Sequence, residues 1–145
     1  MLKQLELADM DAAALVHRRA FDQALPSLVG LHTPREDQWF FRERLFKSCQ
    51  VWGAFDATEM TGIIAFRLDW IDQLYVLPKA QGRGVGTALL QVAQSSLDRL
   101  HLWTFQRNMQ ARRFYEARGF TLIEETGGAG NEEKEPDALY LWVRR

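Results

Sequence analysis

Three glycines stand at every second position in the segment LPKAQGRGVGTALL, at Gly82, Gly84 and Gly86, between an apolar strand-like run and an apolar helix-like run. A flexible surface turn explains one glycine easily but three alternating ones poorly. Glycines between a buried strand and the first turn of a helix let backbone N–H groups converge on one point, where the helix dipole also favours negative charge. The segment therefore predicts a phosphate-binding loop.

Two common phosphate-binding motifs are excluded by the neighbouring residues. The loop of nucleoside triphosphatases requires Gly-Lys-Ser/Thr, and no such triplet follows here. The dinucleotide fingerprint requires a third glycine at the position that Leu89 occupies. The ligand of this loop must belong to another class of phosphate compounds.

A second motif lies downstream of the glycine loop, in NMQARRFYEARGF. With the first, it resembles the GCN5-related N-acetyltransferase (GNAT) family over about residues 52–120. Gln81, Gly84 and Gly86 match the family's pyrophosphate motif, Gln/Arg-x-x-Gly-x-Gly/Ala. The family's pattern Asn-x-x-Ala-x-x-Phe-Tyr-x-x-x-Gly-Phe is matched by Asn108, Ala111, Phe114, Tyr115, Gly119 and Phe120. Two motifs in the right order are far more specific than one.

The resemblance implies an α/β (α+β) fold with a mixed, mostly antiparallel central sheet, flanked by about four helices and splayed between its fourth and fifth strands. These two strands would hold residues 74–77 and 102–105. The implied cofactor is acetyl-CoA, whose pantetheine arm would lie in the gap and whose pyrophosphate would meet the N–H groups of residues 82–87. The implied cofactor-binding residues are Leu74, Tyr75, Val76, Gln81, Gly82, Arg83, Gly84, Val85, Gly86, Thr87, Asn108, Phe114 and Tyr115.

Acetyl transfer from a thioester to an amine needs a neutral amine, a polarised carbonyl and a proton for the departing thiolate. The resemblance implies direct attack in a ternary complex, with Tyr115 as the general acid and a backbone N–H near Val76 facing the thioester oxygen. Asn108 has both a helix-cap role and a cofactor role available. Without the motif around it, Tyr115 would be interpreted as an ordinary core aromatic.

The general base is not evident, because Trp103 and Thr104 stand where some relatives carry a carboxylate. Asp72 is a tentative base or substrate contact, and His101 is a weaker alternative. A water chain that leads the amine proton to solvent is at least as good an explanation as either.

The acceptor amine is not identified by the sequence. The variable segments that would contact it are residues 21–34, which include His32, residues 70–72 and the loop 127–137. Three tryptophans, Trp39, Trp70 and Trp103, either line an apolar pocket or belong to the core. The loop either attracts a cation or is simply solvated; its acidic side chains are Glu132, Glu133, Glu135 and Asp137.

The elements that must position these residues follow from periodicity and caps. A helix is expected at residues 9–23, with Asp9 as its cap, and a second begins at Thr33 with a capping box to Glu36 and a face of Trp39, Phe40, Leu45 and Phe46. Three antiparallel strands are expected within residues 50–77, then a helix at 84–99, a strand at 100–105 and a helix at 108–118 that Gly119 ends. Two closing strands flank the loop 127–137.

Composition limits the remaining alternatives. The 145 residues predict one domain, 1–145, and a net charge of −1 with a pI near 6.3 argues against nucleic acid or an anionic membrane as partner. The single cysteine, Cys49, excludes an internal disulfide and is interpreted as structural, and no metal is expected. The chain is predicted to be soluble and cytoplasmic. The resemblance implies a small-molecule or peptide amine as partner, with a homodimer left open. The alternative to an enzyme is a non-catalytic sensor of acyl-CoA.

Overall fold

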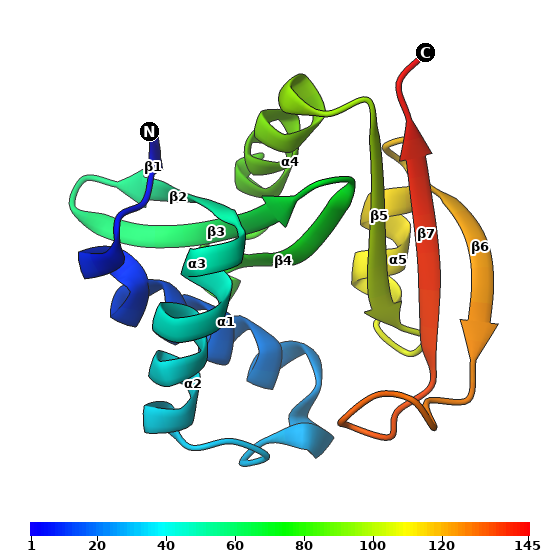
Figure 1. Cartoon of the computed structure of the whole chain (residues 1–145), viewed down its shortest axis with the longest axis horizontal. Coiled ribbons are helices and arrows are strands. Elements are labelled where there is room, and N and C mark those ends of the chain that lie inside the picture. Colours follow the sequence, from blue (N-terminus) through cyan, green and yellow to red (C-terminus); the bar gives the residue numbers. More distant parts are fainter.

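A seven-stranded sheet with the order β1-β2-β3-β4-β5-β7-β6 organises the computed structural model, which describes all residues from 1 to 145 (Figure 1). All neighbouring strands are antiparallel except β4 and β5, which are parallel. The strands are β1 (Leu2–Gln4), β2 (Gln50–Asp56), β3 (Glu59–Arg67), β4 (Trp70–Val76), β5 (Arg99–Phe105), β6 (Thr121–Thr126) and β7 (Asp137–Val143). The predicted mixed, mostly antiparallel sheet is confirmed; only β1 had no counterpart among the predicted elements.

The helices lie on both faces of this sheet. They are α1 (Met10–Ala24), α2 (Pro34–Phe40), α3 (Phe46–Ser48), α4 (Val85–Ser96) and α5 (Met109–Glu116). The sheet has a hydrophobic core on each face, and successive side chains of β3 point into one core and then the other. Ile63 packs with α1 and with the helical segment that contains Phe41 and Leu45, whereas Ile64 packs with α4 and α5. Since β3 is covered on both sides, it is apolar almost throughout. None of the helices is both long and apolar enough to cross a bilayer.

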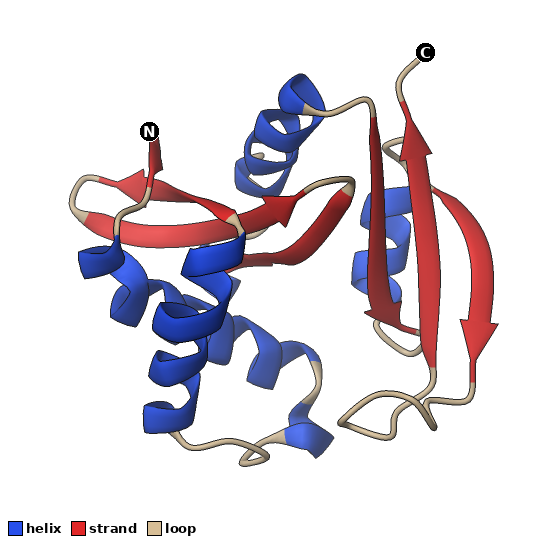
Figure 2. Cartoon of the chain, in the orientation of Figure 1, coloured by secondary structure: helices blue, strands red, loops and turns tan.

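The sheet is splayed between β4 and β5, as predicted. Only Trp70 and His101 form a ladder pair between these strands, supported by a 2.7 Å hydrogen bond from the His101 N–H to the Asp69 carbonyl. Beyond that point the two strands diverge, and Figure 2 shows β1–β4 and β5–β7–β6 as two half-sheets turned away from each other. The splay leaves one edge of β4 open.

The second helix begins as the sequence predicts. Thr33 Oγ1 accepts from the Glu36 N–H at 3.1 Å, and the Glu36 carboxylate accepts from the Thr33 N–H at 2.8 Å, which completes a capping box. The predicted cap of α1 differs, since the Asp9 carboxylate accepts from the Glu6 N–H and so closes a preceding 3₁₀ turn, Leu7–Asp9.

The apolar face predicted for the second helix is partly wrong. Phe41 and Leu45 are buried against α1, while Trp39 and Phe40 are 54% and 41% exposed. The physical reason is a π-helical stretch at Phe41–Leu45, which joins α2 to α3 and changes the rotation of side chains about the axis. The two exposed aromatic rings therefore line a surface cleft.

Candidate active site

The glycine loop presents a row of unused hydrogen-bond donors. The N–H groups of residues 82–87 donate to no acceptor within the chain, and no side chain caps the start of α4. Gly82 and Gly84 have φ angles of +76° and +83°, and a Cβ atom added to either would meet nothing within 4 Å. Left-handed backbone of this kind favours glycine and turns successive N–H groups toward one side. The arrangement is a cradle for an anion at the N-terminus of a twelve-residue helix.

The open edge of β4 supplies a second set of unpaired backbone groups. The Leu77 N–H donates to the Thr61 carbonyl at 2.8 Å, so the alternation of the ladder directs the backbone groups of Leu74 and Val76 away from β3 and into the gap. One of them is used within the chain, because Gln81 Nε2 donates to the Val76 carbonyl at 3.0 Å. The edge can therefore pair with the amide groups of an extended ligand.

A cleft of about 170 Å³ unites the two predicted motifs. Its walls come from α1, β4, the glycine loop and α5, and include Leu74, Tyr75, Val76, Gln81, Gly82, Gly86, Asn108, Phe114 and Tyr115. Asn108 caps α5, with its Oδ1 accepting from the Ala111 N–H at 3.2 Å. The structure thus brings most of the sequence-predicted cofactor residues together, while Arg83 lies exposed on the loop.

Tyr115 is the only residue of α5 in this cleft whose side chain carries a hydroxyl group. The residue is 8% exposed, and its hydroxyl makes no hydrogen bond within the chain. Burial, followed by the influence of Tyr75, raises the pKa of Tyr115 above the ordinary tyrosine value. The phenol therefore keeps its proton at neutral pH, and its hydroxyl is free to donate a hydrogen bond.

Arg118 is a site residue that the sequence interpretation missed, although it lies inside the quoted second motif. Its Nε and Nη2 donate to Thr87 Oγ1 at 3.0 and 2.8 Å, and its guanidinium stacks 3.8 Å from the centre of the Phe114 ring. The side chain ties α5 to the first turn of α4 and adds positive charge beside the cradle. The only feature of the sequence that could have pointed to Arg118 was its position directly before Gly119, the residue that ends the helix.

On the other side of β4 a larger cleft of about 660 Å³ adjoins one of about 500 Å³. The two share five residues from α1, β4, β5 and the β6–β7 loop, namely Phe21, Tyr75, Trp103, Phe105 and Glu133. Tyr75 also lines the 170 Å³ cleft, and Ala24 and Asn108 line both that cleft and the one of about 500 Å³, so the three clefts adjoin one another. Trp39 and Trp103 line the larger cleft, whereas Trp70 lies against His101 at the ladder pair instead.

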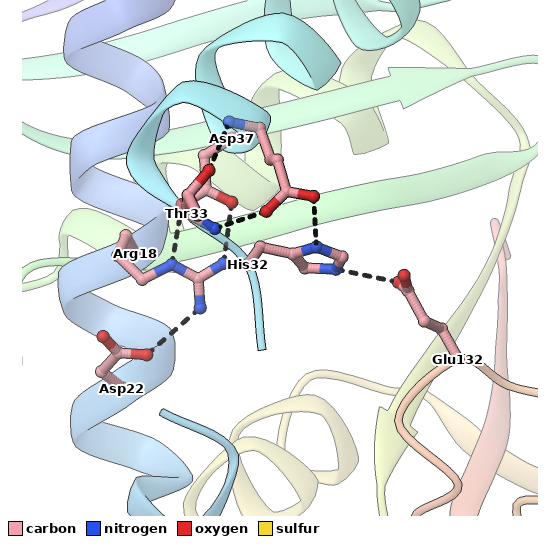
Figure 3. Close-up of polar contacts among 7 residues, drawn as sticks. Arg18, Asp22, His32, Thr33, Asp37 and Glu132 are labelled. Atoms are coloured by element: carbon pink, nitrogen blue, oxygen red, sulfur yellow. Dashed lines mark hydrogen bonds and ion pairs between the residues drawn. The ribbon is translucent and has the colours of Figure 1, made fainter. Parts of the chain in front are cut away.

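A network of charged side chains fixes one wall of the larger cleft (Figure 3). Arg18 Nε and Nη2 donate to the buried Asp37 carboxylate at 2.8 and 2.9 Å, and Nη1 reaches Asp22 at 3.2 Å. Hydrogen bonding to Asp37 is the largest cause that raises the pKa of Arg18. Nearby, His32 Nε2 lies 3.1 Å from the carboxylate of Glu132, so the loop after α1 contacts the β6–β7 loop.

The Asp72 carboxylate, the tentative base, is engaged within the chain. It lies at a β-bulge, since Ala65 pairs with Gln73 and Phe66 with Ile71. Its Oδ2 accepts from Arg67 Nε at 2.8 Å and from Cys49 Sγ at 2.9 Å. Burial, followed by the Asp72 contact, raises the pKa of the Cys49 thiol to about 12, which makes it a poor nucleophile.

His101 lines neither the 170 Å³ cleft nor the two larger clefts. Its Nδ1 lies 3.3 Å from the Asp69 carbonyl and its ring stacks on Trp70, at a centroid distance of 5.0 Å. These contacts stabilise the single point where β4 meets β5.

Comparison with known proteins identifies the family. A model of the acetyltransferase (GNAT) domain matches residues 47–122, which is more than half of the chain. The chain belongs to the GNAT family. This agrees with the two motifs on which the resemblance was based, both of which lie inside the matched range.

Among relatives of the GNAT chain, the peptidyl-lysine N-acetyltransferase YiaC of Escherichia coli is 30% identical over 84 residues, covering 57% of this chain and 58% of YiaC. The matches span between 56% and 60% of the length of the curated relatives. The fold matches the solution structure of apo YjaB from E. coli, with a TM-score of 0.81, 19% identity and coverage of 100% and 98%. It also matches the PaiA N-acetyltransferase of Thermoplasma acidophilum in complex with coenzyme A, with a TM-score of 0.73, 18% identity and coverage of 99% and 98%.

Proposed function

We propose that this GNAT chain is an N-acetyltransferase that transfers the acetyl group of acetyl-CoA to a primary amine by direct attack in a ternary complex. The observation that carries the proposal is the cradle of six consecutive unused N–H groups beside the open edge of β4. Its chemistry suits a pyrophosphate attached to an arm with amide groups. The coenzyme A bound to the PaiA structure and the family match support the same cofactor.

The residues that would hold acetyl-CoA are already arranged for it. Residues 82–87 bind the pyrophosphate, Leu74 and Val76 pair with the arm, and Asn108 and Phe114 complete the cleft. When bound, acetyl-CoA supplies the acetyl group as an activated thioester. The backbone donors of residues 82–87 are unsatisfied before the ligand arrives, so no bond within the chain has to break for them to bind it.

The chain's own residues then assist the transfer. The Val76 N–H faces the gap and donates toward the thioester oxygen, and the Tyr115 hydroxyl gives its proton to the departing sulfur. Cys49 does not take part, since its thiol is held by Asp72 and stays protonated. A direct transfer therefore needs no covalent enzyme intermediate.

The acceptor is a primary amine that enters from the far side of Tyr75. The clefts there hold aromatic walls and several carboxylates, which suits a cationic group on an apolar stem. YiaC, a peptidyl-lysine N-acetyltransferase, supports an amine of the lysine type.

Calorimetric titration with acetyl-CoA, followed by thiol release in the same sample with a panel of alkylamines and lysine peptides, tests the proposal. Saturable binding with thiol release is the expected result. Absence of binding would contradict the assignment of the cradle. Binding without release for every amine would instead favour the acyl-CoA sensor.

A further inference from the structure

The β6–β7 loop, residues 127–137, is held by an internal network. Asn131 Nδ2 donates to the Glu135 carbonyl at 2.7 Å and to Asp137 Oδ2 at 3.1 Å, and its Oδ1 accepts from the Glu135 N–H at 3.2 Å. Lys134 Nζ donates to the Ala129 carbonyl at 2.8 Å, and Arg107 Nη2 donates to the Glu135 carboxylate at 2.6 Å. A loop with this many cross-links presents its remaining side chains in fixed positions.

Most carboxylates that line the two acceptor-side clefts already have a partner in the chain. Arg18 binds Asp37, Arg67 and Cys49 bind Asp72, and His32 faces Glu132. Two more carboxylates also have partners. Glu36 accepts a hydrogen bond from the Thr33 N–H, and Asp137 accepts one from Asn131 Nδ2. Glu133 alone makes neither a hydrogen bond nor an ion pair.

Glu133 also lies where the two acceptor-side clefts meet. It is half-buried and lines both clefts beside Tyr75, Trp103 and Phe105. Burial, and after it the negative charge of Glu133, raises the pKa of Tyr75 above its ordinary value. An unpaired carboxylate framed by aromatic faces is an environment that attracts an organic cation.

The positive and titratable groups around Glu133 do not neutralise it. Arg18 of α1 is held by Asp37 and Asp22, and His32 faces Glu132 and Glu36. Arg35 of α2 is exposed and lines only the larger cleft. The remaining imidazole, His17, has an Nδ1 without a partner, but burial lowers its pKa to about 4, so it holds a proton poorly.

We propose that Glu133 receives the ammonium group of the acceptor and removes its proton, which makes it the base of the proposed acetyl transfer. The proton passes from the nitrogen to a carboxylate oxygen, leaving a neutral amine with a free lone pair and a neutral carboxylic acid. The inference rests on the proposed function and adds the residue that binds and deprotonates the acceptor.

Binding of n-butylammonium chloride tests the cation site without any turnover. Tryptophan fluorescence, to which Trp103 in the cleft contributes, is followed for wild type, Glu133→Gln and Glu124→Gln, with n-butanol as the neutral analogue. Glu124 is the matched control, an exposed glutamate on β6 with no partner. We expect wild type and E124Q to bind the cation at least ~10-fold more tightly than E133Q. Equal binding by E133Q, no preference over butanol or no saturable binding would overturn the proposal.

The role as base is tested with an amine that the wild type acetylates. At pH 7, E133Q should lose about 100-fold in kcat/KM with unchanged acetyl-CoA affinity, and the deficit should shrink toward pH 10 as the free amine forms in solution. A deficit that is equal at every pH would leave Glu133 without the role of base. If wild type fails to bind acetyl-CoA, the proposed function fails, while the butylammonium titration still decides about Glu133.

Discussion

At the residue scale, the surroundings of Tyr115 decide which form of the phenol is present. Phe114 and Phe120 approach its ring with centroid distances of 5.3 Å each, and the side chain is almost wholly buried. An apolar environment penalises the phenolate, which is why the pKa is raised. The same aromatic packing that makes Tyr115 resemble a core residue thus keeps its phenol protonated.

Tyr115→Phe should lower kcat by about 100-fold while leaving the calorimetric affinity for acetyl-CoA unchanged, because only the hydroxyl is removed. With the pKa of Tyr115 raised, the wild-type rate should show no loss from deprotonation of this residue below about pH 10. Steady-state kinetics from pH 6 to pH 10 measure both effects. Equal rates for the two proteins across that range would remove the acid role.

The residues that line the two larger clefts could be predicted from the sequence only in part. Glu133 was named among four acidic side chains of its loop, and Trp103 among three tryptophans, but no local pattern distinguishes them from their neighbours. Their distinction depends on partners far along the chain, such as His32 for Glu132 and Arg107 for Glu135. These pairings arise from the packing of loops, which spacing in the sequence does not encode.

At the element scale, the start of α4 is a helix terminus that the chain itself leaves uncapped. Its missing cap is the clearest reason to expect an anion there. The glycines that reveal it are local signals, so this part of the site could be predicted from the sequence, as could the capping box at Thr33 and Glu36. The exposed rings of Trp39 and Phe40 could not, because the π-helical stretch that rotates them has no comparable sequence signature.

Gly84→Asp should abolish measurable acetyl-CoA binding, because it places a negative charge and bulk in the cradle. Gly30→Asp is a matched control, since Gly30 also has a positive φ, +86°, with open space around it, but lies in the loop after α1. Both substitutions place a side chain on left-handed backbone and should therefore lower the unfolding free energy by a similar amount, ~1 kcal/mol. Calorimetry separates them; loss of affinity in both would contradict a local effect at the cradle.

The corner between α1 and α2 depends on the Arg18–Asp37 pair. Asp37→Ala leaves the guanidinium without its bidentate partner and should lower the unfolding free energy by about 3 kcal/mol. Asp22→Ala removes only the more exposed contact one helical turn away and should cost about 0.5 kcal/mol or less. Urea denaturation measures both. Similar losses for the two variants would show that the corner does not depend on Asp37.

At the scale of the whole molecule, the sheet consists of two half-sheets joined through a single ladder pair. An arm that bonds to Leu74 and Val76 would extend the hydrogen bonding of β4 along the gap. Ligand binding and the stability of the native state are therefore linked, by about 2.7 kcal/mol at a ligand concentration one hundred times Kd.

Hydrogen exchange at Leu74 and Val76 measures this link directly. Both N–H groups point into the gap and should exchange roughly 100-fold more slowly with acetyl-CoA at that concentration. Adenosine 5′-diphosphate keeps the pyrophosphate but lacks the arm, so it should protect residues 82–87 without protecting β4. Equal protection of β4 by both ligands would mean that the arm does not lie along this strand.

The position of β7 has a consequence for how the molecule assembles. β7 follows β6 in the chain but lies between β5 and β6, and it pairs along its whole length with β5 and nearly so with β6. Neither of these strands can therefore form its ladder with β7 during synthesis until residues 137–143 have left the ribosome. The half-sheet of β1–β4 contains only sequential hairpins and short-range pairs apart from β1, which favours its earlier folding. The half-sheet of β5, β7 and β6, which lies across the gap from β4, is therefore expected to form after the half-sheet of β1–β4.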